Sequence, residues 1–298
     1  MNRSKIIGST ALATLMSAGA ASAEMSLNGL MTGKVMDDDG GGLSQSISTN
    51  SIYVSYSDSL DNGMGVSVVM SISDAGANKG GITIDTGMGS LKFAEAGDSA
   101  ADSFDSNPGC FSILDCYNVA ISGKAGGTNI YDDGDGPSGN SIKYSNSMGG
   151  VSFSISRGME SATVDPVMSF AAKTSIMGAT VAAGVSQIDY KSTATADKDP
   201  SFVTVGYSIA GLNLGYAVYD SDENGEETTM GVGTSVAGMD VGVQFASYDA
   251  ATDTDYMRVS LNKGMGPMSF GVDYIEIDEA GGTTNDADQW KLNYVVGF

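Results

Sequence analysis

The sequence predicts an all-β fold: a transmembrane antiparallel β-barrel of 16 strands, with short periplasmic turns and long extracellular loops. Three observations support this prediction. Apolar and polar residues alternate with a period of two, which is typical of strands with two unlike faces. Short glycine-containing turns alternate along the chain with longer polar loops, as they do in membrane barrels. The polar face consists mostly of Ser, Thr, Gly and Asn, while the charges gather in the loops.

The segment 290–298 shows the alternation most clearly. One face carries Trp, Leu, Tyr, Val and Phe, and the other carries Lys, Asn, Val and Gly. The same pattern returns at 66–72, 151–155 and 257–261. Helical spacing of apolar residues is not sustained anywhere, so we expect strands whose apolar face meets lipid and whose polar face meets water.

The connections between these segments are of two kinds. Seven short turns combine Gly with a small residue or Met, and Gly supplies the positive φ that a tight hairpin needs. They lie at 63–65, 87–89, 148–150, 177–178, 210–211, 237–239 and 264–266. Eight longer polar segments alternate with them, at 37–44, 74–80, 97–139, 157–165, 189–200, 220–226, 249–254 and 278–288. Fifteen connections imply 16 strands, with the short turns at one rim and the long loops at the other.

Residues 1–23 have the features of a secretory signal peptide. Arg3 and Lys5 form a basic start, an apolar run follows from residue 6 to 21, and Ala21-Ser22-Ala23 is an A-x-A cleavage site. We therefore expect the mature chain, residues 24–298, to form the barrel. Its later part has no run of about 18 apolar residues, so no membrane-spanning helix is predicted there.

The composition excludes several classes of function. The chain has 298 residues, no His and only 2 Cys, which excludes Ser-His-Asp triads, imidazole metal sites and Cys₄ zinc sites. Its formal net charge of −22 argues against nucleic acid as a partner, because phosphates require a basic surface. We therefore predict that the protein is not an enzyme and that it holds no cofactor or metal.

Three features of the mature chain resemble one known family. They are the terminal Phe298 preceded by alternating aromatics, the Gly-Ser-Leu-Lys-Phe strand at 89–93 that leads to Gly97-Asp98, and the long segment 97–139. Together they are similar to a Gram-negative general diffusion porin of the alphaproteobacterial, sixteen-stranded type. The resemblance implies a bacterial outer-membrane location and passive diffusion of small hydrophilic solutes and ions.

The resemblance also implies how the parts would act. Segment 97–139 would be the third loop, folded into the pore to narrow it, and Phe298 would be the signal read by the barrel assembly machinery. It implies a homotrimer with its interface near the closing seam, in contact with outer-membrane lipids and lipopolysaccharide. The sequence departs from the enterobacterial loop motif Pro-Glu-Phe-Gly-Gly, the nearest piece being Asn107-Pro108-Gly109.

Strand parity assigns charged residues to the pore. The expected basic wall consists of Lys34, Lys92, Lys143, Lys173, Arg258 and Lys291. The third loop supplies the acidic residues Asp98, Asp102, Asp105 and Asp115. We hypothesise a transverse field between the two sets, since charges in a constriction decide ion preference. The net negative charge favours a weak preference for cations.

The two cysteines lie inside the third loop. Cys110 and Cys116 are six positions apart in an exported chain, and an oxidising compartment with an even cysteine count favours a disulfide between them. A redox-active pair is the alternative, but the spacing matches no thiol-exchange motif.

The acidic clusters 37–40 and 132–136 invite the interpretation of loose calcium binding. Neither completes an EF-hand, so solvated acidic loops are the favoured interpretation.

Two other functions stay open at this stage. A non-conducting outer-membrane barrel with a structural or adhesive role has the same patterning. A soluble secreted β-domain also gives a period of two, with its polar face in water. A non-conducting barrel would form no channels in a planar bilayer, whereas a porin would. A soluble secreted domain would stay in the aqueous supernatant without detergent, whereas a membrane barrel would not.

Overall fold

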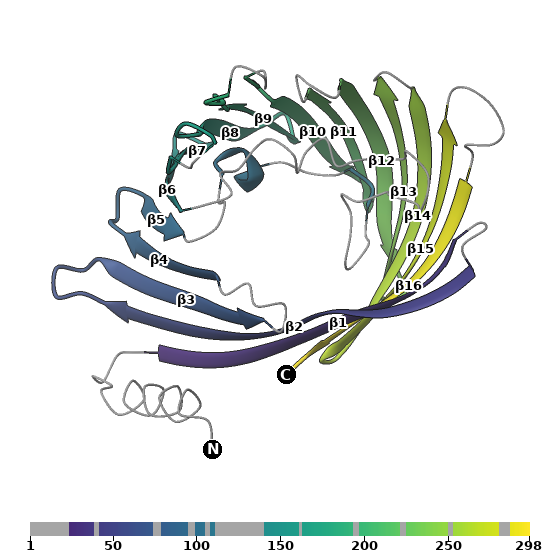
Figure 1. The fold of residues 1–298 in the computed structure, drawn as a ribbon, viewed down its shortest axis with the longest axis horizontal. Coiled ribbons are helices and arrows are strands. Elements are labelled where there is room, and N and C mark those ends of the chain that lie inside the picture. The colour runs from purple at the N-terminus through teal and green to yellow at the C-terminus, as the bar shows by residue number, and fades with distance from the viewer. Residues whose placement is uncertain are drawn as a thin grey trace.

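The computed structural model describes residues 24–38, 42–73, 79–94, 99–104, 108–110, 140–160, 163–192, 197–220, 225–249, 253–279 and 287–298. These residues form a closed antiparallel barrel of 16 strands, which confirms the predicted fold class (Figure 1). The strands are β1 (Glu24–Asp38), β2 (Gly42–Ser59), β3 (Gly65–Ser73), β4 (Lys79–Asp85), β5 (Ser90–Ala94), β6 (Ser141–Met148), β7 (Val151–Gly158), β8 (Met168–Ile176), β9 (Ala179–Gln187), β10 (Ser201–Ile209), β11 (Leu212–Asp220), β12 (Glu226–Val236), β13 (Met239–Asp249), β14 (Thr254–Met265), β15 (Met268–Glu279) and β16 (Ala287–Gly297).

Every strand pairs with its neighbours in the sequence, and β1 pairs with β16 to close the ring. Because the ring is closed, each strand has a hydrogen-bonded neighbour on both sides, as a sheet that crosses a hydrocarbon layer requires. A short 3-10 helix, η1 (Ala101–Ser103), lies inside the ring of strands (Figure 1). Among the described residues, no helix is long and apolar enough to span a membrane.

The short connections fall where the sequence predicts them, except that the last is displaced from 264–266 to 266–267, because β14 continues to Met265 and β15 begins at Met268. The turns before β9, β11 and β13 place Met177, Ala210 and Ala237 at φ of 52–53°, each followed by a Gly with positive φ. Two consecutive residues with positive φ define the turn whose twist matches that of the flanking strands. This twist explains why a residue with a side chain is found in a region that side chains usually avoid, and why glycine follows it in each of these three turns.

One predicted loop is shorter in the structure. The polar segment 37–44 was expected to be a connection, but β1 extends to Asp38 and β2 begins at Gly42. The register pairs Asp37 with Leu43 and Asp38 with Gly42. Hairpin pairing thus continues into the acidic run, because backbone hydrogen bonds of a ladder do not depend on the polarity of the side chains.

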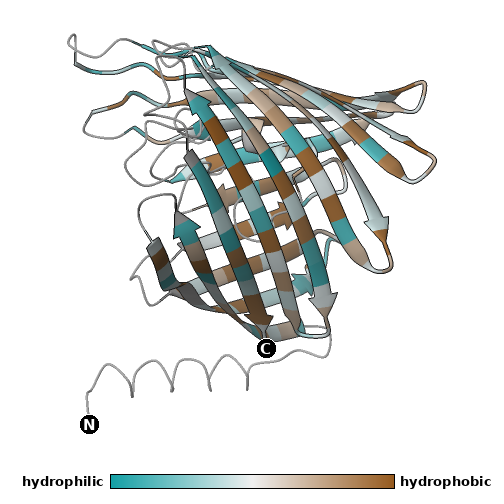
Figure 2. Ribbon diagram, turned by 90° about the vertical axis from the view of Figure 1, so that its right-hand side faces the viewer, coloured by the Kyte–Doolittle hydropathy of each residue, from teal (hydrophilic) through white to brown (hydrophobic). Residues whose placement is uncertain are grey.

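The two faces of the barrel differ as the alternation predicts. Outward-facing aromatic residues such as Phe170, Tyr216 and Trp290 are 45–52% exposed on the isolated chain. Their strand neighbours on the inner face are small or polar, and Ser169 and Gln289 are almost completely buried. Apolar and polar bands alternate along each strand in Figure 2. The apolar face is therefore available to lipid or to a neighbouring protein, as a membrane barrel requires.

The seam between β1 and β16 is closed by aromatic rings lying over glycines. The backbone NH of Gly29 donates to the carbonyl of Phe298 at 2.6 Å, and the NH of Phe298 donates back to Gly29 at 3.0 Å. A Cβ on Gly29 would lie 2.0 Å from the Phe298 ring, and one on Gly33 would lie 2.3 Å from the Tyr294 ring. The absence of a side chain at Gly29 and Gly33 is therefore what lets the two rings lie flat across the seam.

Candidate functional site

Two lysines on the inner wall contact residues of the long connection between β5 and β6. Nζ of Lys143, on β6, donates a hydrogen bond to Oγ of Ser103 at 3.0 Å. Nζ of Lys173, on β8, lies 5.0 Å from the centre of the Phe104 ring, within the range of a cation–π contact. Segment 99–104 therefore lies against the inner face of β6–β8.

Two serines on the wall fix the start of η1. The backbone NH of Ala100 donates to Oγ of Ser156 at 2.8 Å, and that of Ala101 donates to Oγ of Ser169 at 3.0 Å. Both serines are buried, on β7 and β8 respectively. The first amides of a helix have no partner inside the helix, so these wall hydroxyls replace the water that would otherwise satisfy them.

A second segment of the same connection, 108–110, lies against the inner face further round the barrel. Nη1 of Arg258, on β14, donates to Sγ of Cys110 at 3.2 Å. Pro108 and Gly109 lie over Gly215 and Gly231, on β11 and β12. The connection is thus held against the wall at two places, with hydrogen bonds from β6, β7 and β8 at the first and from β14 at the second.

The register places two further basic residues on the inner face. Lys92 lies directly opposite Lys143, and residues directly opposite each other in an antiparallel pair share a face. Lys34 lies opposite Asn293, on the closing pair β1–β16. Lys34, Lys92 and Lys143 are partly exposed, and Lys173 is exposed. Four of the six residues expected in the basic wall are therefore accessible from the interior.

The other two basic residues are covered. Arg258 is 1% exposed and Lys291 is 4% exposed. Lys291 lies directly opposite Asp273 on β15. Asp273 also accepts a hydrogen bond from Nδ2 of Asn293. A buried charge is screened from solutes and balanced by its neighbours, so these two residues contribute less to a field in the lumen than the four accessible lysines do.

The acidic residues expected in the constriction are outside what the structure describes. Asp98, Asp105 and Asp115 fall outside the described residues, and so does Cys116. Asp102 belongs to η1, but its side chain is outside the described set. The transverse field and the disulfide between Cys110 and Cys116 therefore stay predictions.

The inner wall carries acidic residues that the sequence reasoning missed, among them Glu227 and Asp273. Glu227, on β12, accepts hydrogen bonds from Oγ1 of Thr229 and from Oη of Tyr256, both at 2.8 Å. Asp273, on β15, is 1% exposed. The parity that assigns Lys291 to the interior could have found Asp273, because the two are directly opposite across the β15–β16 pair. The wall is therefore mixed in charge rather than purely basic.

The interior is also less uniformly polar than a water-filled pore implies. Two groups of buried apolar residues lie on the inner face: Ala101, Ala171, Ala182, Phe202, Ala217 and Tyr219 in the first, and Ala246, Tyr256, Ile275 and Ile277 in the second. The first group contains a residue of η1, so it is the surface on which that helix is buried. The apolar residues of the first group thus provide the area against which η1 is held.

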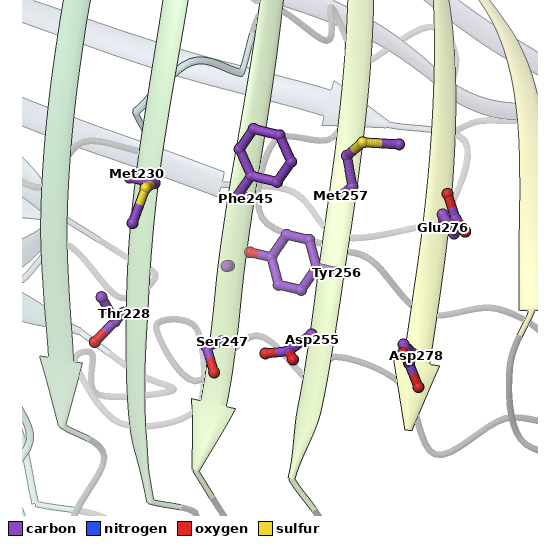
Figure 3. A pocket seen from close by; sticks show the side chains of 10 residues that line it. Thr228, Met230, Phe245, Ser247, Asp255, Tyr256, Met257, Glu276 and Asp278 are labelled. Atoms are coloured by element: carbon purple, nitrogen blue, oxygen red, sulfur yellow. The ribbon is translucent and has the colours of Figure 1, made fainter. Parts of the chain in front are cut away.

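The groove drawn in Figure 3 lies on the outer face and is not part of the lumen. Phe245 and Met257 line it, and Asp255, Glu276 and Asp278 surround it near the rim that carries the long loops. Asp255 and Asp278 are directly opposite in the register. Like charges at opposite positions destabilise a sheet, so this outer rim has an unfavourable arrangement of charge.

The same rim carries more carboxylates on its outer face. They extend from β11 to β1 and consist of Asp220, Glu226, Asp249, Asp255, Asp278, Glu276, Asp288 and Asp37. We call this set the acidic rim. Within the part of the chain that the structure describes, no group of three or more His, Cys, Asp or Glu side chains is arranged to hold a metal ion. The acidic cluster 132–136 lies outside the described residues.

Comparison with known proteins gives a consistent result. A family profile described as "Gram-negative porin" matches residues 8–295. No curated protein sequence matches the chain significantly. An anion-selective porin from Comamonas acidovorans has a similar structure, with a TM-score of 0.71 at 13% identity, over 93% of this chain and 100% of that one.

Two other solved structures are similar over the same share of the chain, with slightly lower TM-scores. A mutant of the porin from Rh. blastica has a TM-score of 0.66 at 15% identity, over 92% of this chain and 100% of that one. A loop-deletion mutant of an outer-membrane protein of Vibrio cholerae has a TM-score of 0.65 at 14% identity, over 93% and 100% of the two chains. At these identities the likeness extends to the fold alone.

Proposed function

Because the chain belongs to the Gram-negative porin family, a family of outer-membrane channels, we propose that small hydrophilic solutes and ions diffuse passively through its barrel, with a weak preference for cations. The proposal is supported above all by one observation. The connection between β5 and β6 is held against the inner wall at residues 99–104 and at residues 108–110. A loop fixed inside a barrel narrows the lumen, and the radius and charge of such a narrowing decide what passes.

The proposed cation preference rests on the balance of two sets of charges. The whole chain has a formal net charge of −22, which raises the local concentration of cations at the mouths of a pore. The accessible Lys34, Lys92, Lys143 and Lys173 act in the opposite direction, so we expect the preference to be small. The predicted acids Asp98, Asp102, Asp105 and Asp115 would supply the negative charge of the transverse field.

Conductance in planar bilayers tests the function directly. We expect the purified protein to form open channels whose conductance increases with salt concentration. A salt gradient should give a reversal potential of the sign that cation preference requires. A pure, folded protein that forms no channels would instead support the non-conducting barrel with a structural or adhesive role.

We further propose a homotrimer in contact with outer-membrane lipids and lipopolysaccharide. The strands β4 and β5 have 7 and 5 residues, whereas a membrane-crossing strand needs about 9–11 residues. The short strands β4 and β5, with outward-facing Ile82 and Phe93, are therefore better covered by a neighbouring copy than by lipid. The proposed interface thus extends from the closing seam through β1–β3 to these two strands. Chemical cross-linking of the detergent-solubilised protein should give a trimer, and a monomer would contradict this part of the proposal.

Processing and assembly complete the proposal. Residues 1–23 would be removed as a signal peptide. The mass of the mature protein, measured by mass spectrometry, should therefore equal that of a chain beginning at Glu24. Phe298 would be the residue that the barrel assembly machinery recognises, and Phe298→Ser should reduce the amount of folded protein in the membrane. Cys110 and Cys116 would form a disulfide, so alkylation under denaturing conditions should label neither cysteine until a reductant is added.

A further inference from the structure

A row of three glycines crosses the inner wall on neighbouring strands. Gly206 on β10 lies directly opposite Gly215 on β11, and Gly215 lies directly opposite Gly231 on β12. The row continues into Gln244 on β13 and Arg258 on β14. Residues at these positions all face the interior, because opposite residues share a face and Arg258 contacts the loop there.

Two of the three glycines leave the space that the loop occupies. A Cβ on Gly215 would lie 2.5 Å from Cβ of Pro108, and a Cβ on Gly231 would lie 2.2 Å from the carbonyl oxygen of Pro108. Neither distance is compatible with van der Waals packing. A Cβ on Gly206 would meet nothing closer than the Leu214 carbonyl oxygen, at 4.0 Å. Gly206 is therefore in the row but outside the contact.

The loop segment itself is shaped to lie in this space. Gly109 has a φ of +75°, and a Cβ on it would lie 2.4 Å from the carbonyl oxygen of Val243 on β13. The next residue, Cys110, accepts the hydrogen bond from Arg258 on β14. The three residues 108–110 thus cross the inner face from β11 to β14 along a single register row.

We infer that Gly215 and Gly231 are positioning residues for the pore loop. They form a seat, which we call the glycine seat, that holds segment 108–110 flat against the wall and so determines how far the loop extends into the lumen. A methyl group on either residue cannot share this space with the loop. It displaces the segment toward the barrel axis and narrows the path. This inference rests on the proposed pore function.

The first test compares three alanine variants from the same row. Gly215→Ala and Gly231→Ala should each lower the single-channel conductance on the order of 1.5-fold and slow the passage of the largest neutral solutes that the wild type admits. Gly206→Ala is the matched control and should conduct like the wild type. Strand content by circular dichroism verifies that each barrel is folded. Equal conductance of Gly206→Ala and the two seat variants would overturn the inference.

A rescue experiment tests the contact itself. Pro108→Gly removes the Cβ and Cγ atoms that a methyl on Gly215 would meet, but it leaves the carbonyl that a methyl on Gly231 would meet. Combined with Pro108→Gly, the Gly215→Ala variant should therefore recover the conductance of Pro108→Gly alone, while Gly231→Ala should not. Rescue of both variants, or of neither, contradicts the seat.

Thermal unfolding in detergent separates failure of the seat from failure of the pore. Gly215→Ala and Gly231→Ala should have lower unfolding temperatures than Gly206→Ala. Addition of Pro108→Gly should restore the unfolding temperature of Gly215→Ala to that of Pro108→Gly alone, but should not restore that of Gly231→Ala. This pattern is independent of conduction. If the wild type forms no channels but the variants show this pattern of unfolding temperatures, the proposed function is refuted and the glycine seat is supported. If the wild type forms channels but the variants do not show the pattern, the proposed function is supported and the glycine seat is refuted.

Discussion

Lys143 and Arg258 project from the same inner face but have different surroundings. Lys143 is partly exposed to the interior, whereas Arg258 is 1% exposed and donates to Cys110 of the loop. In an effective dielectric near that of water an accessible charge acts on ions several ångströms away, whereas the loop segment that covers Arg258 keeps ions further from its charge. Ion preference is therefore expected to depend on the accessible lysines.

The first prediction concerns the pair Lys92 and Lys143. Replacing one with Gln removes a positive charge from the lumen, so the permeability ratio should shift toward cations. At about 8 Å in water a unit charge acts with about 0.5 kcal/mol, which corresponds to roughly a twofold change at low salt. Reversal potentials in planar bilayers measure the ratio. Lys263→Gln, on the outer face of β14, is the control and should leave the ratio unchanged.

The sequence predicts the side of the wall on which these residues lie but not their exposure. Parity is a local property, and it places Lys92, Lys143 and Arg258 on the inner face. Coverage depends on where the loop segment 108–110 lies, which depends on missing side chains at Gly215 and Gly231 more than 100 positions away. Both glycines can be read in the sequence, but no pattern of neighbouring residues predicts that they contact Pro108.

At the level of elements, the ladder and its turns follow from local rules. Period-two alternation and turns with two positive φ values are readable from a few residues each, and the strand number and the seven short turns are confirmed. The extra length of β1 and β2 could not be predicted, because backbone pairing extends through the acidic residues Asp37 and Asp38. The closing seam also depends on residues from opposite ends of the sequence.

The second prediction concerns that seam. Gly29→Ala places a methyl group where the Phe298 ring lies and should lower the stability of the barrel by about 1–3 kcal/mol, as overpacking does elsewhere. Thermal unfolding in detergent gives the change. The control Gly264→Ala has 3.9 Å to its nearest neighbour and should unfold like the wild type. Equal unfolding temperatures for the two variants would mean that the ring moves aside freely.

The third prediction concerns an ion pair between two loops. Lys191 forms a hydrogen-bonded salt bridge with Glu160, and this bond together with the positive charge holds the pKa of the Glu160 carboxyl below its ordinary value. A lowered folded-state pKa means that the pair contributes at pH values above the unfolded pKa and is lost as the pH falls through the folded pKa.

Lys191→Met should therefore raise the titration midpoint of Glu160 toward its ordinary value, as followed by carbon NMR of the labelled carboxyl. Lys198→Met, in the same loop, should leave the midpoint in place. If the titration midpoint of Glu160 is the same in Lys191→Met as in the wild type, the ion pair does not persist in solution.

At the level of the whole molecule, the negative charge is distributed unevenly. The acidic rim faces outward on β11–β16 and β1, near the long loops, and includes opposed pairs such as Asp255 with Asp278 and Glu276 with Asp288. The accessible lysines face inward on β1, β5, β6 and β8. The formal charge of −22 therefore conceals an acidic rim on the outer face and an inner wall that is mixed in charge.

The fourth prediction tests the cost of the acidic rim. Asp278→Asn removes the repulsion with Asp255 and should raise the stability by about 0.5 kcal/mol. Because salt screens exposed charges, the gain should shrink in 1 M NaCl. Unfolding temperatures of both proteins in detergent at low and high salt give the comparison. A gain that is independent of salt would point to a cause other than repulsion.

The pairing of β1 with β16 has a consequence for the order of folding. Every other strand pair joins neighbours in the chain, all but β5–β6 through much shorter connections, whereas the seam joins Leu30 to Gly297. Bringing together the ends of a flexible loop of that length costs on the order of 5 kcal/mol in chain entropy. Local hairpins form without this cost, so the seam is expected to be the last pairing to form. Until the seam forms, the outer edges of β1 and β16 are unpaired and can pair with strands of other chains. Closure of the seam is therefore the step that ends the risk of such pairing between chains.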